Sequence, residues 1–166
     1  MARTGLQRNV TPTMDLILWR HAEAEDAPVG GDDLERALTP RGHRQAARVA
    51  AWLVQNLPDS ARVLCSPARR CQQTVKALDR AYKTEARLAP GADPQDVLQA
   101  AGWPDGKRAV LIVGHQPTLG ETVARLLGLA TAEWPVRKAG VWWLRTRTRD
   151  GRDQTTVVAV QSPDTV

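Results

Sequence analysis

The stretch DLILWRH, residues 15–21, is a short apolar run that ends in an arginine and a histidine. An apolar run bounded by polar residues is typical of a buried β-strand that leads into a loop. Two similar runs, 62–65 and 109–113, end in Ser66 and in Gly114-His115. Because ligands of parallel sheets bind beyond the carboxyl ends of the strands, we expect these three strand ends to form one pocket.

Helical patterns lie between these strands. Thr39-Pro40 is typical of a helix N-cap followed by proline at the first helical position, and apolar residues then recur at helical spacing until Pro58. Ser66-Pro67 repeats this signal and predicts a helix running toward Tyr82. The remaining elements are expected in this order: a weak strand over 86–88, helices over 94–100 and 117–127, and strands over 141–144 and 155–160 joined by a turn at 150–151.

The alternation of strands and helices favours an α/β fold. We expect a three-layer sandwich with a mostly parallel central sheet, helices on both faces and a C-terminal antiparallel hairpin. The length of 166 residues suits one domain, which we place at 14–166 after a disordered leader over 1–13. The sequence contains neither a membrane-length apolar run nor a secretory signal pattern, so we expect a cytoplasmic protein without membrane contact. Cys65 and Cys71 are expected to be reduced thiols.

The formal charge of +5 and the pI of about 9.9 would suit a nucleic-acid partner if the basic residues formed one binding face. However, the charge is uneven, with an acidic segment over 23–35 and a basic region over 137–152. One Tyr and no Phe offer little for stacking on bases, although six Trp are present. We therefore expect no nucleic-acid partner, and interpret the basic region as a solvated face.

Four ordered blocks resemble the signature of the histidine phosphatase superfamily, which includes phosphoglycerate mutases and SixA-type phosphohistidine phosphatases. They are LWRHAEA at 18–24, LTPRG at 38–42, SPARRCQQT at 66–74 and VGHQP at 113–117. Ala22 stands where the family usually has Gly. The interval from Thr74 to Gly114 is too short for the helical lid of the mutases, and Gln116 stands where acid phosphatases of this group place Asp. The resemblance is therefore to the compact SixA type.

The resemblance implies a chemistry that needs no metal and no other cofactor. His21 would be the nucleophile, since a neutral imidazole attacks phosphorus near pH 7 and forms a phosphohistidine that water can cleave. Arginine offers a planar fork that stays protonated and can hold the phosphoryl oxygens. Arg70 fits the family spacing, whereas Arg69 would point about 100° away on a helix. The implied site residues are therefore His21, Arg20, Arg70 and His115 for catalysis, with Thr39, Ser66 and Glu23 for substrate binding.

Some candidate residues also have ordinary interpretations. Thr39 can be only a helix cap, Glu23 only a solvent-facing charge and His115 only a loop histidine. His43 lies within an amphipathic helix between basic residues, and we interpret it as solvated and outside the site.

The leading hypothesis is a metal-independent phosphatase with a covalent phosphohistidine intermediate, whose substrate is a phosphohistidine on a partner protein. The sequence has no evident acid to protonate a leaving alkoxide, which favours this substrate over alkyl esters. The alternatives are a phosphatase of small sugar or nucleotide phosphates and a non-catalytic phosphoprotein-binding module. A basic nucleic-acid binder is the least favoured hypothesis.

Overall fold

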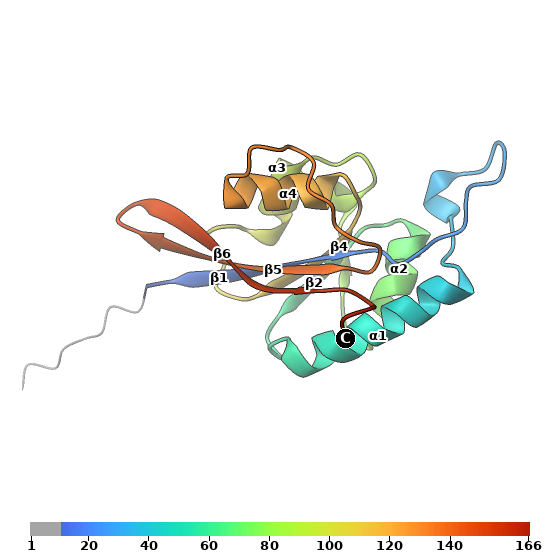
Figure 1. Cartoon of the computed structure of the whole chain (residues 1–166), viewed down its shortest axis with the longest axis horizontal. Coiled ribbons are helices and arrows are strands. Elements are labelled where there is room, and N and C mark those ends of the chain that lie inside the picture. Colours follow the sequence, from blue (N-terminus) through green and yellow to red (C-terminus); the bar gives the residue numbers. More distant parts are fainter. Residues whose placement is uncertain (1–10) are drawn as a thin grey trace, which may run out of the picture.

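The computed structural model describes residues 11–166, and its elements form a sheet covered by helices on both faces (Figure 1). Most of the expected leader over 1–13 lies outside the described residues, and Thr13 at its end already belongs to the first strand. The strands are β1 (Thr13–Arg20), β2 (Arg62–Cys65), β3 (Lys83–Thr84), β4 (Val110–Gly114), β5 (Val141–Arg149) and β6 (Arg152–Gln161).

The six strands form one sheet in the order β3-β2-β4-β1-β5-β6. Strands β1 to β4 are parallel, while β5 is antiparallel to β1 and forms the C-terminal hairpin with β6. The predicted mostly parallel sheet with an antiparallel hairpin is therefore confirmed. Both strands of the hairpin are longer than predicted, since they extend into polar residues that are largely exposed.

Within residues 11–166, four α-helices cover the two faces of the sheet, α1 and α2 on one and α3 and α4 on the other (Figure 1). The helices are α1 (Pro40–Asn56), α2 (Arg69–Lys76), α3 (Pro94–Ala101) and α4 (Thr118–Leu127), with two 3-10 turns, η1 (Asp33–Glu35) and η2 (Ala86–Leu88). The start of α1 is as predicted: Thr39 is the N-cap, its Oγ1 accepts from Gly42 N at 2.9 Å, and Pro40 is the first helical residue.

Alternation along β1 creates two hydrophobic cores. Ile17 and Trp19 face α1 and α2, while Leu16 and Leu18 face α3 and α4, and all four side chains are buried. A strand that is apolar on both faces belongs in the middle of a covered sheet, where β1 and β4 lie. The three-layer sandwich is confirmed.

Two local predictions are wrong. The helix expected from Ser66-Pro67 to Tyr82 begins only at Arg69 and ends at Lys76, because the Ser66 hydroxyl is engaged by His115 and Ala68 is the N-cap. The segment 86–88 is the 3-10 turn η2, capped by Glu85, and not a strand. The strand in this region is the two-residue β3, which is polar and exposed.

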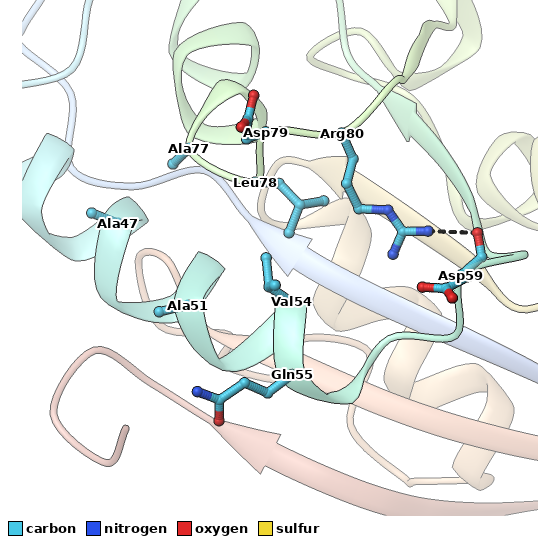
Figure 2. A pocket seen from close by; sticks show the side chains of 9 residues that line it. All are labelled: Ala47, Ala51, Val54, Gln55, Asp59, Ala77, Leu78, Asp79 and Arg80. Atoms are coloured by element: carbon cyan, nitrogen blue, oxygen red, sulfur yellow. Dashed lines mark hydrogen bonds between the residues drawn. The ribbon is translucent and has the colours of Figure 1, made fainter.

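A groove of about 740 Å³ lies between α1 and the end of α2, lined by residues that include Val54, Leu78 and Arg80 (Figure 2). Arg80 Nη2 donates to the carbonyl oxygen of Asp59 at 2.8 Å across one end of the groove. None of the predicted site residues lines the groove. Over 11–166, no helix is long and apolar enough to cross a membrane.

Candidate active site

The ends of β1, β2 and β4 are joined by backbone hydrogen bonds. His21 N donates to Gly114 O at 3.1 Å, and Ser66 N donates to Val113 O at 3.0 Å. The segment before β5 closes the other side, where Ala139 N donates to His21 O at 3.1 Å. The predicted meeting of three strand ends is therefore what the fold produces, at the carboxyl edge of the parallel strands.

The ring of His21 is held in one tautomer. Its Nδ1 lies 2.8 Å from the carbonyl oxygen of Ala22, and a carbonyl oxygen can only accept, so Nδ1 carries the hydrogen. The lone pair of the neutral ring is then on Nε2. Burial, with a smaller contribution from the charges of Arg70 and Arg20, lowers the pKa of His21 to about 4. His21 is therefore neutral, with a free lone pair, at physiological pH.

His115 packs beside His21, with a ring centroid separation of 5.3 Å. Its Nε2 is 2.7 Å from Ser66 Oγ, and its Nδ1 is 3.4 Å from Arg70 Nη2. Since Arg70 can only donate, Nδ1 accepts and Nε2 donates its hydrogen to Ser66. Burial, followed by the neighbouring His21, lowers the pKa of His115 to about 3. To donate to a phosphoryl oxygen through Nδ1, the ring must take the other tautomer, with the Ser66 hydroxyl donating to Nε2.

Two arginines approach the histidines from different elements. Arg70, in the first turn of α2, is buried, whereas its neighbour Arg69 is exposed. Arg20 lies at the end of β1, and its Nη1 donates to Val136 O at 2.8 Å. In the described part of the chain, the Nε atoms of both Arg20 and Arg70 are buried without a hydrogen-bond partner. Unpaired buried N–H groups are costly, and an oxyanion bound between these arginines would satisfy them.

Ser66, Thr39 and Glu23, the remaining predicted residues, have structural partners. Ser66 Oγ accepts from Ala68 N at 3.2 Å in addition to its bond with His115. Thr39 Oγ1 donates to Glu23 Oε1 at 2.8 Å, so these two bind each other while Thr39 caps α1. Ser66 therefore belongs to the histidine cluster, whereas Thr39 and Glu23 brace the loop that follows His21.

Two residues outside the predicted site have contacts with the cluster. Thr74 Oγ1 accepts from Ala22 N at 3.1 Å and donates to Arg70 O at 2.7 Å, which ties the backbone after His21 to α2. Asp33 binds Arg70 from the acidic segment, through Oδ2 at 3.0 Å from Nη2. Thr74 was recognisable as the last residue of its signature block. Nothing in the sequence distinguished Asp33 from its acidic neighbours.

Gln116 and Cys71 supply neither a proton nor a second nucleophile. The amide group of Gln116 is bound to the backbone: its Oε1 accepts from Gly120 N at 2.7 Å, and its Nε2 donates to Trp134 O at 2.8 Å. Cys71 Sγ lies 3.5 Å from His115 Nε2, but burial raises the pKa of the Cys71 thiol to about 12. The thiol is therefore protonated and unreactive at neutral pH. In residues 11–166 no cluster of three His, Cys, Asp or Glu side chains could hold a metal ion.

The fold and the site together define an α/β sandwich with two histidines and two arginines at the carboxyl edge of its parallel strands. The chain belongs to the histidine phosphatase superfamily, branch 1, whose family model matches residues 16–104.

The most informative relatives are of the SixA type. A phosphohistidine phosphatase SixA homolog from Haemophilus influenzae is 33% identical over 131 residues, which cover 69% of this chain and 78% of that protein. A solved structure of the protein histidine phosphatase SixA complexed with tungstate has a TM-score of 0.74 and 26% identity, and covers 91% of this chain and 98% of that one.

Other matches are less specific. A mycobacterial glucosyl-3-phosphoglycerate phosphatase, Rv2419c, shares the fold alone, with a TM-score of 0.63, 20% identity, and coverage of 89% of this chain and 98% of that one. The chain spans 63% of the length of the first mycobacterial relatives that it matches, proteins without an assigned function that are 34% to 38% identical to it.

Proposed function

We propose that this protein is a metal-independent phosphatase that acts through a phosphohistidine at His21, and that it removes phosphate from a phosphohistidine carried by a partner protein. The observation that carries the proposal is the 2.8 Å contact between His21 Nδ1 and Ala22 O in a buried, neutral ring. This contact leaves Nε2 as the nucleophilic atom. Support also comes from the SixA relatives, one of which is complexed with tungstate, an oxyanion.

The reaction divides into two displacements. In the first, the His21 Nε2 lone pair forms a bond to phosphorus while the bond from phosphorus to the substrate nitrogen breaks, and its electron pair stays on the leaving imidazole. In the second, a water oxygen attacks phosphorus, the bond to Nε2 breaks, and the water proton is transferred to the released phosphate or to solvent. Arg20 and Arg70 offset the charge on the equatorial oxygens in both steps.

In residues 11–166 no protonated acid contacts the cluster, which favours phosphohistidine over alkyl esters. Of the described carboxylates, Asp33 contacts the cluster, and hydrogen bonds from Arg36 and Arg70 lower its pKa, so it is ionised at neutral pH. An alkoxide leaving group needs a proton that an ionised carboxylate cannot give. A phosphorylated imidazole is protonated on its other nitrogen near neutral pH and leaves as a neutral ring.

A labelling experiment tests the covalent step. Brief incubation of the wild-type protein with a labelled phosphohistidine protein should trap an adduct that is labile in acid and stable in base, as expected for a phosphoryl–nitrogen bond. His21→Ala should form no adduct, while His43→Ala, a matched change at an exposed histidine of α1, should form it normally. Adduct formation by the His21 variant, or a base-labile adduct, would contradict the assignment of the nucleophile.

A comparison of substrates tests the specificity. We expect kcat/KM to be highest for a phosphohistidine protein, lower for an activated aryl phosphate and lowest for an alkyl phosphate, and to be insensitive to chelators. Equal or faster cleavage of the alkyl ester would move the small-phosphoester phosphatase to first place. If phosphate is bound but none of the three substrates is cleaved, the protein is a binding module.

A further inference from the structure

The acidic segment after His21 folds into a closed loop, which we call the latch loop, residues 25–37. Its base is fastened by Glu25 N donating to Ala37 O at 2.8 Å and by an antiparallel bridge between Ala24 and Leu38. Its far part carries η1 and reaches α2 through Asp33. The loop is therefore anchored at its base by backbone contacts and at its far end by one residue.

Asp33 occupies both terminal nitrogens of Arg70. Arg70 Nη1 donates to the Asp33 main-chain oxygen at 2.7 Å, and Nη2 donates to Asp33 Oδ2 at 3.0 Å. The other carboxylate oxygen, Oδ1, accepts from Arg36 Nη1 at 3.1 Å. The Arg70 side chain is only 5% exposed, whereas that of Asp33 is 53% exposed. Arg70 is thus the buried partner of this contact, and the latch loop is the partner on the solvent side.

The carboxylate of Asp33 competes with an incoming phosphoryl group. A guanidinium presents five N–H hydrogens, and Asp33 takes one on each terminal nitrogen of Arg70, while the Nε hydrogen has no partner. In addition, a carboxylate within a few ångströms of a bound phosphoryl group repels it. An anion can take the two terminal hydrogens that Asp33 now binds only after Asp33 has moved.

We propose that Asp33 determines specificity as an internal anion, which a small phosphate displaces poorly and a protein-borne phosphoryl group displaces well. This inference rests on the proposed function and names the feature that would restrict the site to protein substrates. Two large apolar side chains of the latch loop face solvent: Val29 is fully exposed and Leu34 is 39% exposed. A protein surface around the phosphohistidine can bury these side chains and offset the cost of opening the loop, whereas inorganic phosphate cannot.

The test measures binding of inorganic phosphate by isothermal titration calorimetry. Asp33→Asn removes the charge but keeps an oxygen that can accept from Nη2, so it separates competition from positioning. If the contact between Asp33 and Arg70 is open in about a tenth of the molecules, loss of this contact should tighten phosphate binding about tenfold. The matched control is Asp32→Asn, because Asp32 Oδ1 accepts from Leu34 N at 2.9 Å and the charge change is the same one residue away. This control should bind phosphate as the wild type does.

Two results would overturn the proposal. If Asp33→Asn binds phosphate as weakly as the wild type or more weakly, the carboxylate positions Arg70 and does not compete. If Asp32→Asn tightens binding equally, the effect is one of net charge alone. Because phosphate binding requires no turnover, these results are independent of whether the protein hydrolyses any substrate. A failed labelling experiment at His21 would refute the proposed function and leave the binding comparison interpretable.

Hydrogen exchange gives a second readout of the same displacement. Saturating phosphate should speed amide exchange in residues 28–35 of the wild-type latch loop, since the contact with Arg70 is lost. Unchanged or slower exchange in that segment would mean that Asp33 stays on Arg70 when the anion binds, which would also overturn the proposal.

Discussion

Arg70 connects the histidines of the candidate active site with the latch loop and with α2. It binds Asp33, contacts His115 and receives a hydrogen bond from Thr74 at its main-chain oxygen. Arg69, which precedes it on α2, is exposed. Because these adjacent arginines differ so much in burial, separate substitutions can test which of them binds the phosphoryl group.

We predict that Arg70→Ala lowers kcat/KM by about 10²- to 10³-fold, because it removes a charged donor to the phosphoryl oxygens. Arg69→Ala should change kcat/KM by less than about twofold. The measurement is steady-state hydrolysis of one activated aryl phosphate by both variants, with thermal melting to confirm folding. Equal losses in the two variants would place the phosphoryl group elsewhere.

Ser66 is the partner of His115 Nε2 through a 2.7 Å contact, in which its hydroxyl accepts in one tautomer of the ring and donates in the other. Ser66→Ala should lower kcat about tenfold, the effect of roughly 1.4 kcal/mol for one lost buried hydrogen bond. It should also change the ¹⁵N chemical shifts of the His115 ring, which report the tautomer. The control is Thr122→Val, which removes a buried hydroxyl bonded to Thr118 O within α4 and should leave kcat unchanged. Unaltered ¹⁵N shifts of the His115 ring and unaltered kcat in Ser66→Ala would contradict the role assigned to the serine.

The sequence predicted the histidines and arginines of the cluster but not Asp33. Arg20, His21, Arg70 and His115 could be found because each lies in a signature block at a strand or helix boundary. Asp33 lies in a loop whose composition resembles any solvated acidic segment. Its contact with Arg70 spans 37 positions and depends on how the loop closes, which local residue patterns do not encode.

Helix α1 supports the loop after His21 through close backbone packing. Thr39 and Glu23 bind each other there, and Gly42 in the first turn lies against the backbone of Glu23. A methyl group on Gly42 would overlap the carbonyl oxygen of Glu23, and this backbone atom cannot rotate out of the way as the end of a side chain can. The glycine of the LTPRG block is therefore required for the helix to approach the loop.

We predict that Gly42→Ala lowers both stability and activity. Moving α1 away from the loop should cost about 1–3 kcal/mol of unfolding free energy, as for an overpacked core position, and should displace His21 through Ala22 and Glu23. Urea-induced unfolding and aryl phosphate hydrolysis measure the two effects. Gly106→Ala is the control, since its methyl would overlap only with the flexible end of Met14 and would lie 3.4 Å from Gly102 O, an ordinary contact. Normal activity in Gly42→Ala would show that the loop tolerates a shift of α1.

The elements that the sequence predicted well were those with a strong local signal. The N-cap and proline at Thr39-Pro40 act within one turn, and the predicted helix start is confirmed. At Ser66-Pro67 the same signal was misleading, because the serine hydroxyl binds a histidine 49 positions away as well as the nearby Ala68 N. Strand β3 has two exposed polar residues and becomes a strand only by pairing with β2. Its existence depends on a neighbour and not on its own side chains.

The two buried histidines make the stability of the whole protein depend on pH. Their pKa values of about 4 and 3 lie below the ordinary value of 6.5. Between these values the two histidines are protonated in the unfolded chain and neutral in the folded protein. The contribution to stability is therefore fully present above pH 6.5 and is lost as pH falls toward these lower values. Stability falls in this direction because the unfolded state binds more protons than the folded state below pH 6.5.

We predict that the free energy of unfolding falls by roughly 1.5 kcal/mol for each of these histidines between pH 6.5 and pH 5. Urea-induced unfolding at several pH values over this range measures the slope. His21→Gln should remove about half of it, whereas His43→Gln, at an exposed position of α1, serves as the matched control. A free energy of unfolding that is constant from pH 7 to pH 5 would contradict burial of neutral rings.

The layered architecture was predictable from the alternation of strands and helices, but the strand order was not. The order is set by pairings such as that of Leu16 with Val110, which joins segments that local patterns cannot connect. The sequence did indicate that three strand ends share one edge, since that follows from parallel strands in general. The segment 136–140, which braces Arg20 and His21, carries no signature and could not be anticipated.

The position of that bracing segment affects how the protein is made. His21 is synthesised before its backbone partners Gly114 and Ala139, and Gly140, which accepts from Arg20 N, follows them. During translation the first signature block therefore emerges ahead of the segments that orient it. The backbone contacts that hold the histidine can form only after residues 136–140 have left the ribosome.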